Sequence, residues 1–370
     1  MADLAKNGLL THCQNFSMTK HPSSTSAMIR LSHLLGRGQL WPLAPASALV
    51  GAIASARDLA FRWGLLPSQA AGVPVISVGN CIAGGSGKTP VVAELLDLLL
   101  ALKRQPAVIA RGYGAEADGR NDEAKMLPGP VHCHPRRVRA AAEAIAAGAD
   151  CLIMDDGFQH RALQRHLDLV CIDASRPWGW VDSRRGAYLP WGLMREGPAA
   201  LRRAQALIAS RWDQASEAQR SHLRNLAHGR QLPLLRCQHR PHRLRPVHAT
   251  PTAAGAGDQL EQLPQGRWLA LSAIAHPQAF HHTLRQAGAQ LVEFISFPDH
   301  HHFRACDLRA VRQRAAQHKA RVICTAKDAV KLAALVAELP AMECWCLDIQ
   351  LHWEGQDRLR LQQLVVQALL

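Results

Sequence analysis

A glycine-rich stretch, set between an apolar run and a helical pattern, most constrains how this chain can fold. Residues 73–78 are rich in valine and isoleucine and are typical of a buried strand, whereas residues 91–102 carry apolar side chains at helical spacing. The stretch between them contains Gly79, Gly84, Gly85, Gly87, Lys88 and Thr89. A strand, a glycine loop, a Lys-Thr pair and a helix, in this order, form the layout of a phosphate-binding loop.

Each residue type in the loop suits the binding of a nucleotide's phosphates. Glycines allow successive backbone N–H groups to point at phosphate oxygens, so residues 84–87, including Ser86, form the candidate cradle. The N-terminus of the following helix adds a partial positive charge. We expect Lys88 to reach the β- and γ-phosphates and the Thr89 hydroxyl to bind Mg²⁺. The strict pattern has a glycine where this chain has Ile82, so a glycine-rich turn with a coincidental Lys-Thr pair is the alternative.

The order of apolar and helical segments after the loop predicts the fold class. Apolar strands at 107–110, 151–154 and 169–172 alternate with helical patterns, which is typical of a mostly parallel sheet covered on both faces. We therefore predict an α/β protein with a P-loop NTPase-like, mostly parallel sheet sandwiched by helices, a second smaller α/β domain and an N-terminal amphipathic helix. The predicted divisions are 1–37, a disordered extension; 38–72, the amphipathic segment; 73–212, the P-loop domain; 213–264, a linker with a possible β-ribbon; and 265–370, the C-terminal α/β domain.

The segment 38–72 predicts a helix that lies in a membrane interface. Its uncharged part is short and interrupted by proline and glycine, which is marginal for spanning a bilayer. The apolar side chains that share one helical face are Leu49, Ile53, Ala56, Ala60 and Trp63. An apolar face with arginines outside it and tryptophans at both ends suits the interface between lipid and water. The alternative is an ordinary amphipathic helix packed on the domain.

Charge and composition narrow the classes of partner. The 370-residue chain has a net charge of +14, which favours acidic partners. Only 5% of the residues are aromatic, and no basic stripe is interleaved with aromatic side chains, so we expect phosphates or lipid headgroups and no nucleic acid. The ten cysteines show no metal or redox spacing, which indicates buried, reduced thiols in a cytosolic compartment.

Two consecutive carboxylates follow one of the predicted strands. Asp155 and Asp156 end the apolar run 151–154. Chemistry in parallel α/β sheets gathers at the carboxyl ends of the strands, where the phosphate-binding loop also lies. We therefore predict that Thr89, Asp155 and Asp156 form the Mg²⁺ site, in the manner of a Walker-B carboxylate. The alternative is a pair of solvated acids in a β-turn.

Seven motifs together resemble those of the tetraacyldisaccharide 4′-kinase family, and the resemblance covers residues 38–370. In chain order they are Gly84-Gly-x-Gly-Lys-Thr-Pro90, Arg111-Gly-Tyr-Gly114, Asn121-Asp-Glu123, Asp155-Asp-Gly-Phe-Gln-His160, Leu189-Pro-Trp-Gly-Leu-Met-Arg-Glu196, Pro298-Asp-His300 and Thr325-Ala-Lys-Asp-Ala-Val-Lys331. The resemblance also accounts for Ile82, because the family's loop lacks that glycine too.

The resemblance implies a kinase of lipid A biosynthesis. Its members transfer the γ-phosphate of ATP, with Mg²⁺, to the 4′-hydroxyl of a tetraacylated glucosamine disaccharide 1-phosphate. This lipid substrate and the inner-membrane surface would be the partners, and the enzyme would lie peripherally at the cytoplasmic face of the bacterial inner membrane. The family fold implied is two α/β/α domains joined by a two-stranded link, with the site in the cleft.

The resemblance also implies the roles of individual residues. Asp122 would be the general base and His300, from the second domain, its partner, with Lys88 as the third catalytic residue. The residues implied in substrate binding are Tyr113, Arg137, His160, Arg195 and Glu196. Their patterns alone leave simpler interpretations open, since a loop acid, an exposed loop histidine, a solvated helical arginine and a tyrosine that packs its own loop are all common.

Two other classes of function compete with the kinase. A soluble P-loop NTPase that acts as a switch or metallocentre chaperone predicts clustered Cys and His ligands and no membrane-seeking segment. A non-enzymatic protein that binds anions or nucleic acid is favoured only by the net charge of +14.

Overall fold

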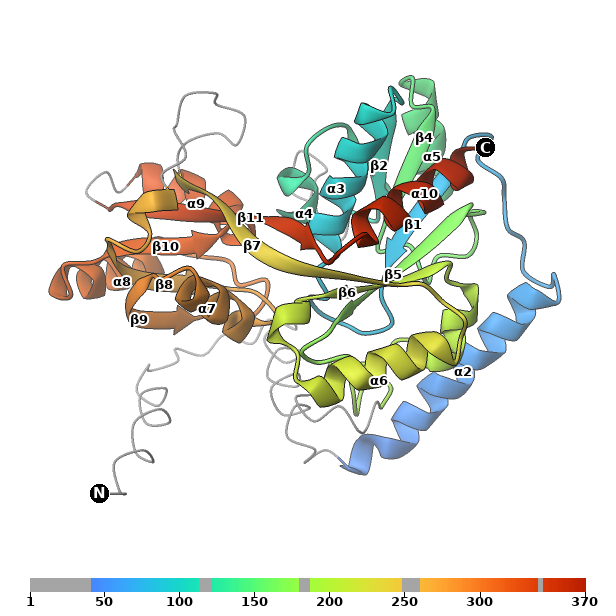
Figure 1. Cartoon of the computed structure of the whole chain (residues 1–370), viewed down its shortest axis with the longest axis horizontal. Helices are drawn as coiled ribbons and strands as arrows, with labels where there is room; N and C mark the ends of the chain where they lie inside the picture. Colours follow the sequence, from blue (N-terminus) through green and yellow to red (C-terminus); the bar gives the residue numbers. More distant parts are fainter. Residues whose placement is uncertain (1–40, 113–121, 180–186, 248–259, 339–341) are drawn as a thin grey trace.

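The computed structural model describes residues 41–112, 122–179, 187–247, 260–338 and 342–370. The predicted disordered extension, 1–37, lies outside this range. Within it, one sheet runs through the whole molecule with the strand order β3-β2-β4-β1-β5-β6-β7-β11-β10-β8-β9. The sheet has two parallel halves, which are seen on the right and the left of Figure 1.

The first half is a parallel sheet whose strands are almost wholly buried. Its strands are β1 (Val75–Gly79), β2 (Pro106–Ala110), β3 (Val131–Cys133), β4 (Cys151–Asp155), β5 (Leu167–Asp173) and β6 (Ala206–Ser210). Helix α3 (Lys88–Ala101) covers one face, and α5 (Arg137–Ala146) and α6 (Glu217–His228) cover the other. Burial on both faces explains why these strands are continuous apolar runs in the sequence.

The second half repeats the three-layer arrangement on a smaller scale. Its parallel strands are β8 (Arg267–Ser272), β9 (Gln290–Ser296) and β10 (Arg321–Thr325). Helix α7 (Pro277–Gln286) packs on one face, and α8 (Ala305–Gln317) and α9 (Ala326–Ala337) pack on the other. The predicted fold class, with a mostly parallel sheet between helices and a second α/β unit, is therefore confirmed.

Two long antiparallel strands join the halves. Strand β7 (Leu234–Pro246) pairs with β6 at its start and with β11 (Cys344–Trp353) along most of its length, and β11 also pairs with β10. The pair crosses the middle of the molecule in Figure 1. The segment 213–264, which we expected to be a linker with a possible β-ribbon, thus contains α6 and β7, while its residues 248–259 lie outside the described ones.

Helix α6 was not predicted from the sequence, because few of its residues are apolar. Only Leu223 and Ala227 of its residues are buried. Its start is nevertheless encoded locally: the Ser216 hydroxyl accepts from the Gln219 backbone N–H, and the Gln219 side chain accepts in return from the Ser216 N–H. This capping box satisfies two N–H groups that a helix otherwise leaves unpaired.

The last helix crosses from one half to the other. Helix α10 (Asp357–Leu369) follows β11, yet its buried side chains join the core of the first half, on the face that α3 also covers. The division 265–370 places this helix in the second domain by sequence. In the structure it packs on the core of the first domain.

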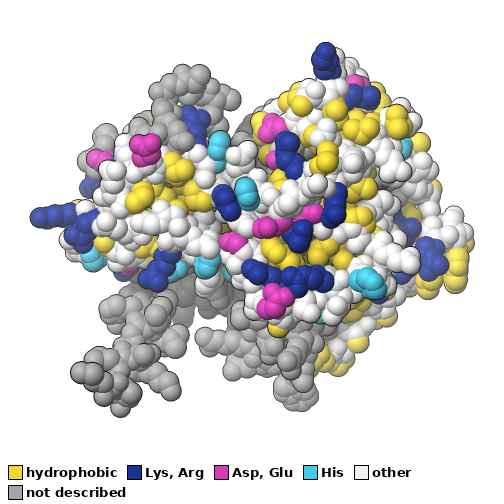
Figure 2. Space-filling view, in the orientation of Figure 1, with side chains coloured by type: hydrophobic (Ala, Val, Ile, Leu, Met, Phe, Trp, Pro, Cys, Tyr) yellow, Lys and Arg dark blue, Asp and Glu magenta, His cyan; other side chains and the backbone are white. Residues whose placement is uncertain are grey.

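Helix α2 (Ala44–Arg62) lies along the outside of the first half, at the lower right of Figure 1. It packs on the protein through the small or polar residues Ser47, Gly51 and Asp58. Figure 2 shows hydrophobic side chains along the same edge of the molecule. Among the described residues, no helix combines the length and the apolar character needed to cross a bilayer.

The crossing helix gives a stability prediction. Leu361 of α10 is fully buried, so Leu361→Ala leaves a cavity between α10 and the first sheet. We expect the free energy of unfolding to fall by about 2–5 kcal/mol, measured by urea denaturation. The control is Leu359→Ala on the same helix, where the side chain is 50% exposed and the expected loss is below about 0.5 kcal/mol. Equal losses in the two variants would contradict the packing of α10.

Candidate active site

The candidate site lies where three neighbouring strands end. Strand β1 pairs in parallel with β4 on one side and with β5 on the other. The last residues of these strands are Gly79, Asp155 and Asp173. The phosphate-binding loop, the Asp155–Asp156 pair and Asp173 therefore meet at one edge of the sheet, as expected for parallel α/β proteins.

The loop between β1 and α3 is held in shape by its own side chains. Asn80 is buried, and its Nδ2 donates to Ser86 Oγ at 2.8 Å and to the Gly84 carbonyl at 3.3 Å. Gly79 must be glycine, because a Cβ there would lie 2.4 Å from the Cβ of Phe158. Gly87 precedes α3 with a left-handed φ of 80°, which a glycine adopts without strain.

Asp156 joins two cations of the site. Its Oδ1 lies 3.3 Å from Lys88 Nζ, at the first residue of α3, and its Oδ2 accepts from Arg195 Nη1 at 2.7 Å. Burial by itself would raise the pKa of the Asp156 carboxyl, but the charges of Lys88 and Arg195 outweigh it and lower that pKa well below its usual value. The carboxylate is thus ionised and fixes the position of both cations.

Hydrogen bonds also hold the backbone of the Asp155–Asp156 pair. Asp156 has a left-handed φ of 49°, so the extended backbone of β4 ends at Asp155. Arg137, at the start of α5, donates from Nη2 to the carbonyl of Asp155 at 2.6 Å and to that of Asp156 at 3.4 Å. Asp155 Oδ1 accepts from the Asp156 N–H at 2.9 Å. In the structure the Arg137 side chain therefore supports the two aspartates by binding their backbone carbonyls.

The oxygen donors at this edge fit a small hard cation. Asp156 Oδ1 is buried and lies 3.3 Å from Lys88 Nζ, and Thr89 follows Lys88 at the start of α3. Among the described residues, no group of three His, Cys, Asp or Glu side chains is arranged to hold a metal. Mg²⁺ needs no such group, because it is bound by one or two carboxylates together with phosphate oxygens and water.

His160 lies in a strongly positive environment. Its Nε2 is buried without a hydrogen-bond partner. Burial, together with the charges of Arg137, Arg57 and Arg165, lowers the pKa of the imidazole to about 4. The ring is therefore neutral at physiological pH, and it lies among guanidinium groups that suit an anion.

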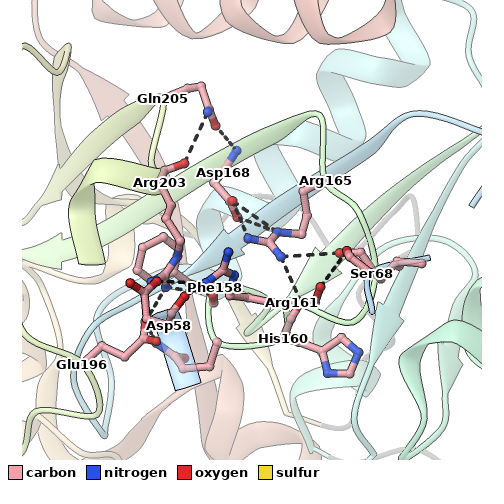
Figure 3. Close-up of polar contacts among 12 residues, drawn as sticks. Asp58, Ser68, Phe158, His160, Arg161, Arg165, Asp168, Glu196, Arg203 and Gln205 are labelled. Carbon is pink, nitrogen blue, oxygen red and sulfur yellow. Dashed lines mark hydrogen bonds and ion pairs between the residues drawn. The ribbon is translucent and has the colours of Figure 1, made fainter. Parts of the chain in front are cut away.

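Glu196 has partners within the protein. Its Oε2 accepts from Arg203 Nη2 at 2.5 Å and from Gln159 Nε2 at 3.3 Å, as Figure 3 shows for Arg203. The Glu196 side chain is buried, and its backbone N–H donates to the carbonyl of Cys81 at 3.3 Å. The neighbouring Arg195 N–H donates to the same carbonyl at 2.8 Å, so this segment is attached directly to the phosphate-binding loop.

Asp122 and His300 both come from segments that lie near helix α9 of the second half. Tyr113 is outside the described residues, and Asp122 begins the short helix α4 (Asp122–Met126), of which the Asp122 side chain is not described. Helix α4 contacts α9. At the start of α9, Lys327 Nζ lies 3.4 Å from His300 Nε2 and donates to Asp299 Oδ1 at 3.0 Å. The structure thus brings His300 and α4 to the same helix.

Sequence reasoning missed a cluster that ties the two halves together. Asp173, at the end of β5, accepts from Arg211 Nη1 at 2.7 Å and lies 3.1 Å from Nδ1 of His276, at the start of α7. Arg176 adds a donor to the carbonyl of Ala275 at 3.2 Å. Burial opposes ionisation of Asp173, but Arg211 and His276 lower its pKa well below the usual value. The available signal was an aspartate directly after the apolar run 169–172.

Comparisons with known proteins agree over almost the whole chain. The family model described as tetraacyldisaccharide-1-P 4′-kinase matches residues 39–369. A tetraacyldisaccharide 4′-kinase from Anaeromyxobacter sp. (strain Fw109-5) is 41% identical over 342 residues, which cover 86% of this chain and 90% of that protein. A protein of the same name from Vibrio cholerae serotype O1 (strain El Tor Inaba N16961) is 31% identical over 340 residues, covering 87% of this chain and 90% of that protein.

A solved structure shows the same fold. The crystal structure of the "apo" form of LpxK from Aquifex aeolicus in complex with ATP matches with a TM-score of 0.66 and 24% sequence identity. The match covers 89% of this chain and 99% of that one. At this identity the likeness concerns the fold alone.

The loop geometry predicts a specific sensitivity at Gly87. A Cβ at this position would lie 3.0 Å from Ser210 Oγ and 3.1 Å from ring atoms of His239, and Ser210 Oγ donates to the Ser86 carbonyl. Gly87→Ala should therefore displace the loop and weaken ATP binding by at least about tenfold in isothermal titration calorimetry.

The matched control is Gly72→Ala. Gly72 has a similar φ of +83°, but a Cβ there meets nothing within 4 Å. This variant shares the cost of a left-handed alanine, about 1–2 kcal/mol, without touching the loop. ATP affinity equal to that of Gly87→Ala would show that crowding at Gly87 does not matter.

Proposed function

This chain belongs to the tetraacyldisaccharide-1-P 4′-kinase family, and we propose that the cluster around Lys88, Asp156 and Arg195 is its centre of phosphoryl transfer. The activity is ATP-dependent phosphorylation of the 4′-hydroxyl of a tetraacyldisaccharide 1-phosphate in lipid A biosynthesis. In this reaction the 4′-oxygen forms a bond to the γ-phosphorus and the bond from that phosphorus to the bridging β,γ-oxygen breaks, so ADP leaves.

One observation supports the placement of the reaction most directly. The Lys88 ammonium, at the N-terminus of α3, lies 3.3 Å from the carboxylate of Asp156, the residue that directly follows strand β4. Phosphoryl transfer depends mainly on positioning and on neutralising the charge of the phosphates. We propose that the amides of residues 84–87 and Lys88 bind the triphosphate, and that Asp156 orients Lys88 toward it.

A magnesium ion fits the same edge of the sheet. Thr89, Asp155 and Asp156 are the residues that would hold it, together with phosphate oxygens. Its contribution when bound is to neutralise charge on the β- and γ-phosphates. The position of Asp155 and Asp156 at the end of β4, beside the strand that leads through the loop to Thr89, supports this assignment.

We propose that Asp122 accepts the proton of the 4′-hydroxyl and that His300 orients its carboxylate. Helix α4, which begins at Asp122, contacts α9, and Lys327 of α9 lies 3.4 Å from the imidazole of His300. The two residues come from different halves of the sheet, so productive geometry depends on how the halves sit relative to each other.

The acceptor lipid carries a phosphate, and the arginine-rich side of the site suits it. We propose that Arg137, His160 and Arg195 bind the polar part of this substrate, with Tyr113 and Glu196 as further contacts. A neutral imidazole can donate a hydrogen bond to a phosphate oxygen, and guanidinium groups bind two such oxygens at once. The neutral state of His160, whose pKa is about 4, is consistent with a donor of this kind.

Helix α2 supplies the contact with the membrane. It turns its apolar side chains outward, with Leu49 62% and Ile53 59% exposed, and keeps Ser47, Gly51 and Asp58 against the protein. This is the reverse of an ordinary surface helix, whose apolar face is buried. We propose that the enzyme lies peripherally on the cytoplasmic face of the inner membrane with this face in the lipid interface, aided by the net charge of +14.

The activity itself is tested with purified protein, labelled ATP, Mg²⁺ and the tetraacyldisaccharide 1-phosphate. Asp122→Ala should lower kcat by at least about a hundredfold, because the hydroxyl proton then has no positioned acceptor. Its ATP affinity should stay within about twofold of the wild type, since Asp122 does not contact the nucleotide in this proposal. Near-normal turnover would remove Asp122 from the mechanism, and a wild type that yields no 4′-phosphorylated lipid would reject the proposed function.

The role of α2 is tested by vesicle co-sedimentation. The double variant Leu49→Ser/Ile53→Ser removes apolar area from the outward face of α2, so its partition into vesicles that contain anionic phospholipid should fall by about tenfold or more. The control is Leu100→Ser, at an equally exposed leucine on α3, which should bind like the wild type. Equal binding by all three proteins would exclude α2 as the membrane contact.

A further inference from the structure

Helix α2 carries one buried acid on an otherwise small and uncharged packing face. Asp58 is only 8% exposed, four residues from the end of the helix. A buried carboxylate is costly unless it is paired, so its partners decide what it does. Figure 3 shows Asp58 beside Arg161 and Arg203, which come from two other segments of the chain.

Three arginines converge on the Asp58 carboxylate. Arg161 Nη1 and Arg203 Nη1 both donate to its Oδ1 at 2.9 Å, and Arg202 forms an ion pair with Oδ2. Arg161 also donates to the backbone carbonyl of Asp58 at 3.1 Å. Arg161 follows His160 in the loop after β4, whereas Arg202 and Arg203 end the short helix η2 (Pro198–Arg203).

Arg203 links this ion cluster to the segment that carries Arg195. Its second terminal nitrogen donates to Glu196 Oε2 at 2.5 Å, and its guanidinium lies over the Phe158 ring with 4.4 Å to the centroid. Both terminal nitrogens of Arg203 are therefore engaged, Nη1 by Asp58 of α2 and Nη2 by Glu196. The planar fork of arginine can hold two carboxylates in fixed relative positions, which lysine cannot do.

Glu196 is connected to the proposed centre of phosphoryl transfer through its neighbour in the chain and two ion pairs. Arg195, the preceding residue, donates to Asp156 Oδ2 at 2.7 Å, and Asp156 Oδ1 faces Lys88 at 3.3 Å. Gln159 connects Glu196 with the phosphate-binding loop a second time. Its Nε2 donates to Glu196 Oε2 at 3.3 Å and to the carbonyl of Asn80, in the loop, at 2.8 Å. Contiguous charged groups of this kind are the physical means by which two sites influence each other.

We propose that Asp58 is a positioning residue, through which the seating of the membrane-facing helix α2 sets the geometry of Arg195, Asp156 and Lys88. The inference rests on the proposed function, since it assigns to α2 a catalytic as well as an anchoring effect. Loss of the Asp58 charge leaves Arg161, Arg202 and Arg203 without their common partner. Arg203 then shifts relative to Glu196, and the Arg195 guanidinium loses its fixed position at Asp156.

The test is a kinetic comparison of Asp58→Asn with the wild type, using ATP and tetraacyldisaccharide 1-phosphate in detergent micelles. Asparagine keeps the shape of the side chain but removes the charge. We expect kcat to fall about tenfold at saturating ATP and lipid, while binding to vesicles stays within about twofold of the wild type. A helix that serves only as an anchor would raise the KM for the lipid and leave kcat unchanged, and that result would overturn the proposal.

A double-mutant cycle checks the route. If Asp58 acts through Arg203 and Glu196, then Asp58→Asn combined with Glu196→Gln should be about as slow as the slower single variant. Independent, multiplying effects on kcat would contradict the route. Asp97→Asn, at an exposed aspartate on α3, is the matched control for the loss of one charge and should keep wild-type turnover.

A milder variant covers the case in which Asp58→Asn does not fold. Arg202→Gln removes only the outermost arginine, whose side chain is 37% exposed, and it leaves the Arg161 and Arg203 contacts in place. We expect a native melting temperature and a kcat about two- to threefold below the wild type. Unchanged turnover in this variant would overturn the inference, whereas an inactive wild type would instead reject the proposed function.

Discussion

The ionised carboxylate of Asp156 is the interaction on which the rest of the site depends. It lies at the end of β4, beside the strand that leads into the phosphate-binding loop, and it holds Lys88 and Arg195 at once. Two cations this close to each other repel, so an anion between them is required to keep both in place. Strand order, the left-handed turn at Asp156 and the support from Arg137 all serve to put that anion there.

The candidate site lies where the two α/β units contact each other. The antiparallel pair β7–β11 fuses both parallel halves into one sheet, and α10 returns to pack on the first half after the chain has completed the second. Contacts across the junction include Asp173 with His276 and Arg176 with the carbonyl of Ala275. Ala275 also lies beside the phosphate-binding loop at Gly84 and Gly85. The second unit thus lies against the loop, and it also carries His300, the proposed partner of Asp122.

Helix α2 shows how a segment can serve two environments. Its inward face consists of small or polar residues, and its one buried acid is neutralised by arginines of the site's surroundings. Its outward face is apolar, which is unfavourable in water and favourable in a lipid interface. Ion pairs of Asp58, rather than buried apolar side chains, therefore hold this helix on the protein.

Local sequence patterns were sufficient for the fold class and for the loop. Buried parallel strands are continuous apolar runs, and the glycines with Lys88 and Thr89 form a signature that depends only on neighbours in the chain. Helix α6 was not predicted, because few of its residues are apolar and buried, and strand β7 was expected only as a possible β-ribbon within a linker. Their structure comes from a capping box and from pairing with distant strands, which periodicity does not detect.

Sequence alone identified the candidate residues for the chemistry: the phosphate-binding loop, the Asp155–Asp156 pair and the motifs that resemble the kinase family. Tertiary structure decided which of these touch. That Asp156 bridges Lys88 and Arg195, that Glu196 faces Arg203, and that Asp58 anchors α2 are outcomes of segments far apart in the chain meeting at one edge of a sheet. The physical reason is that an ion pair is fixed by distance in space, and spacing along a sequence does not encode it.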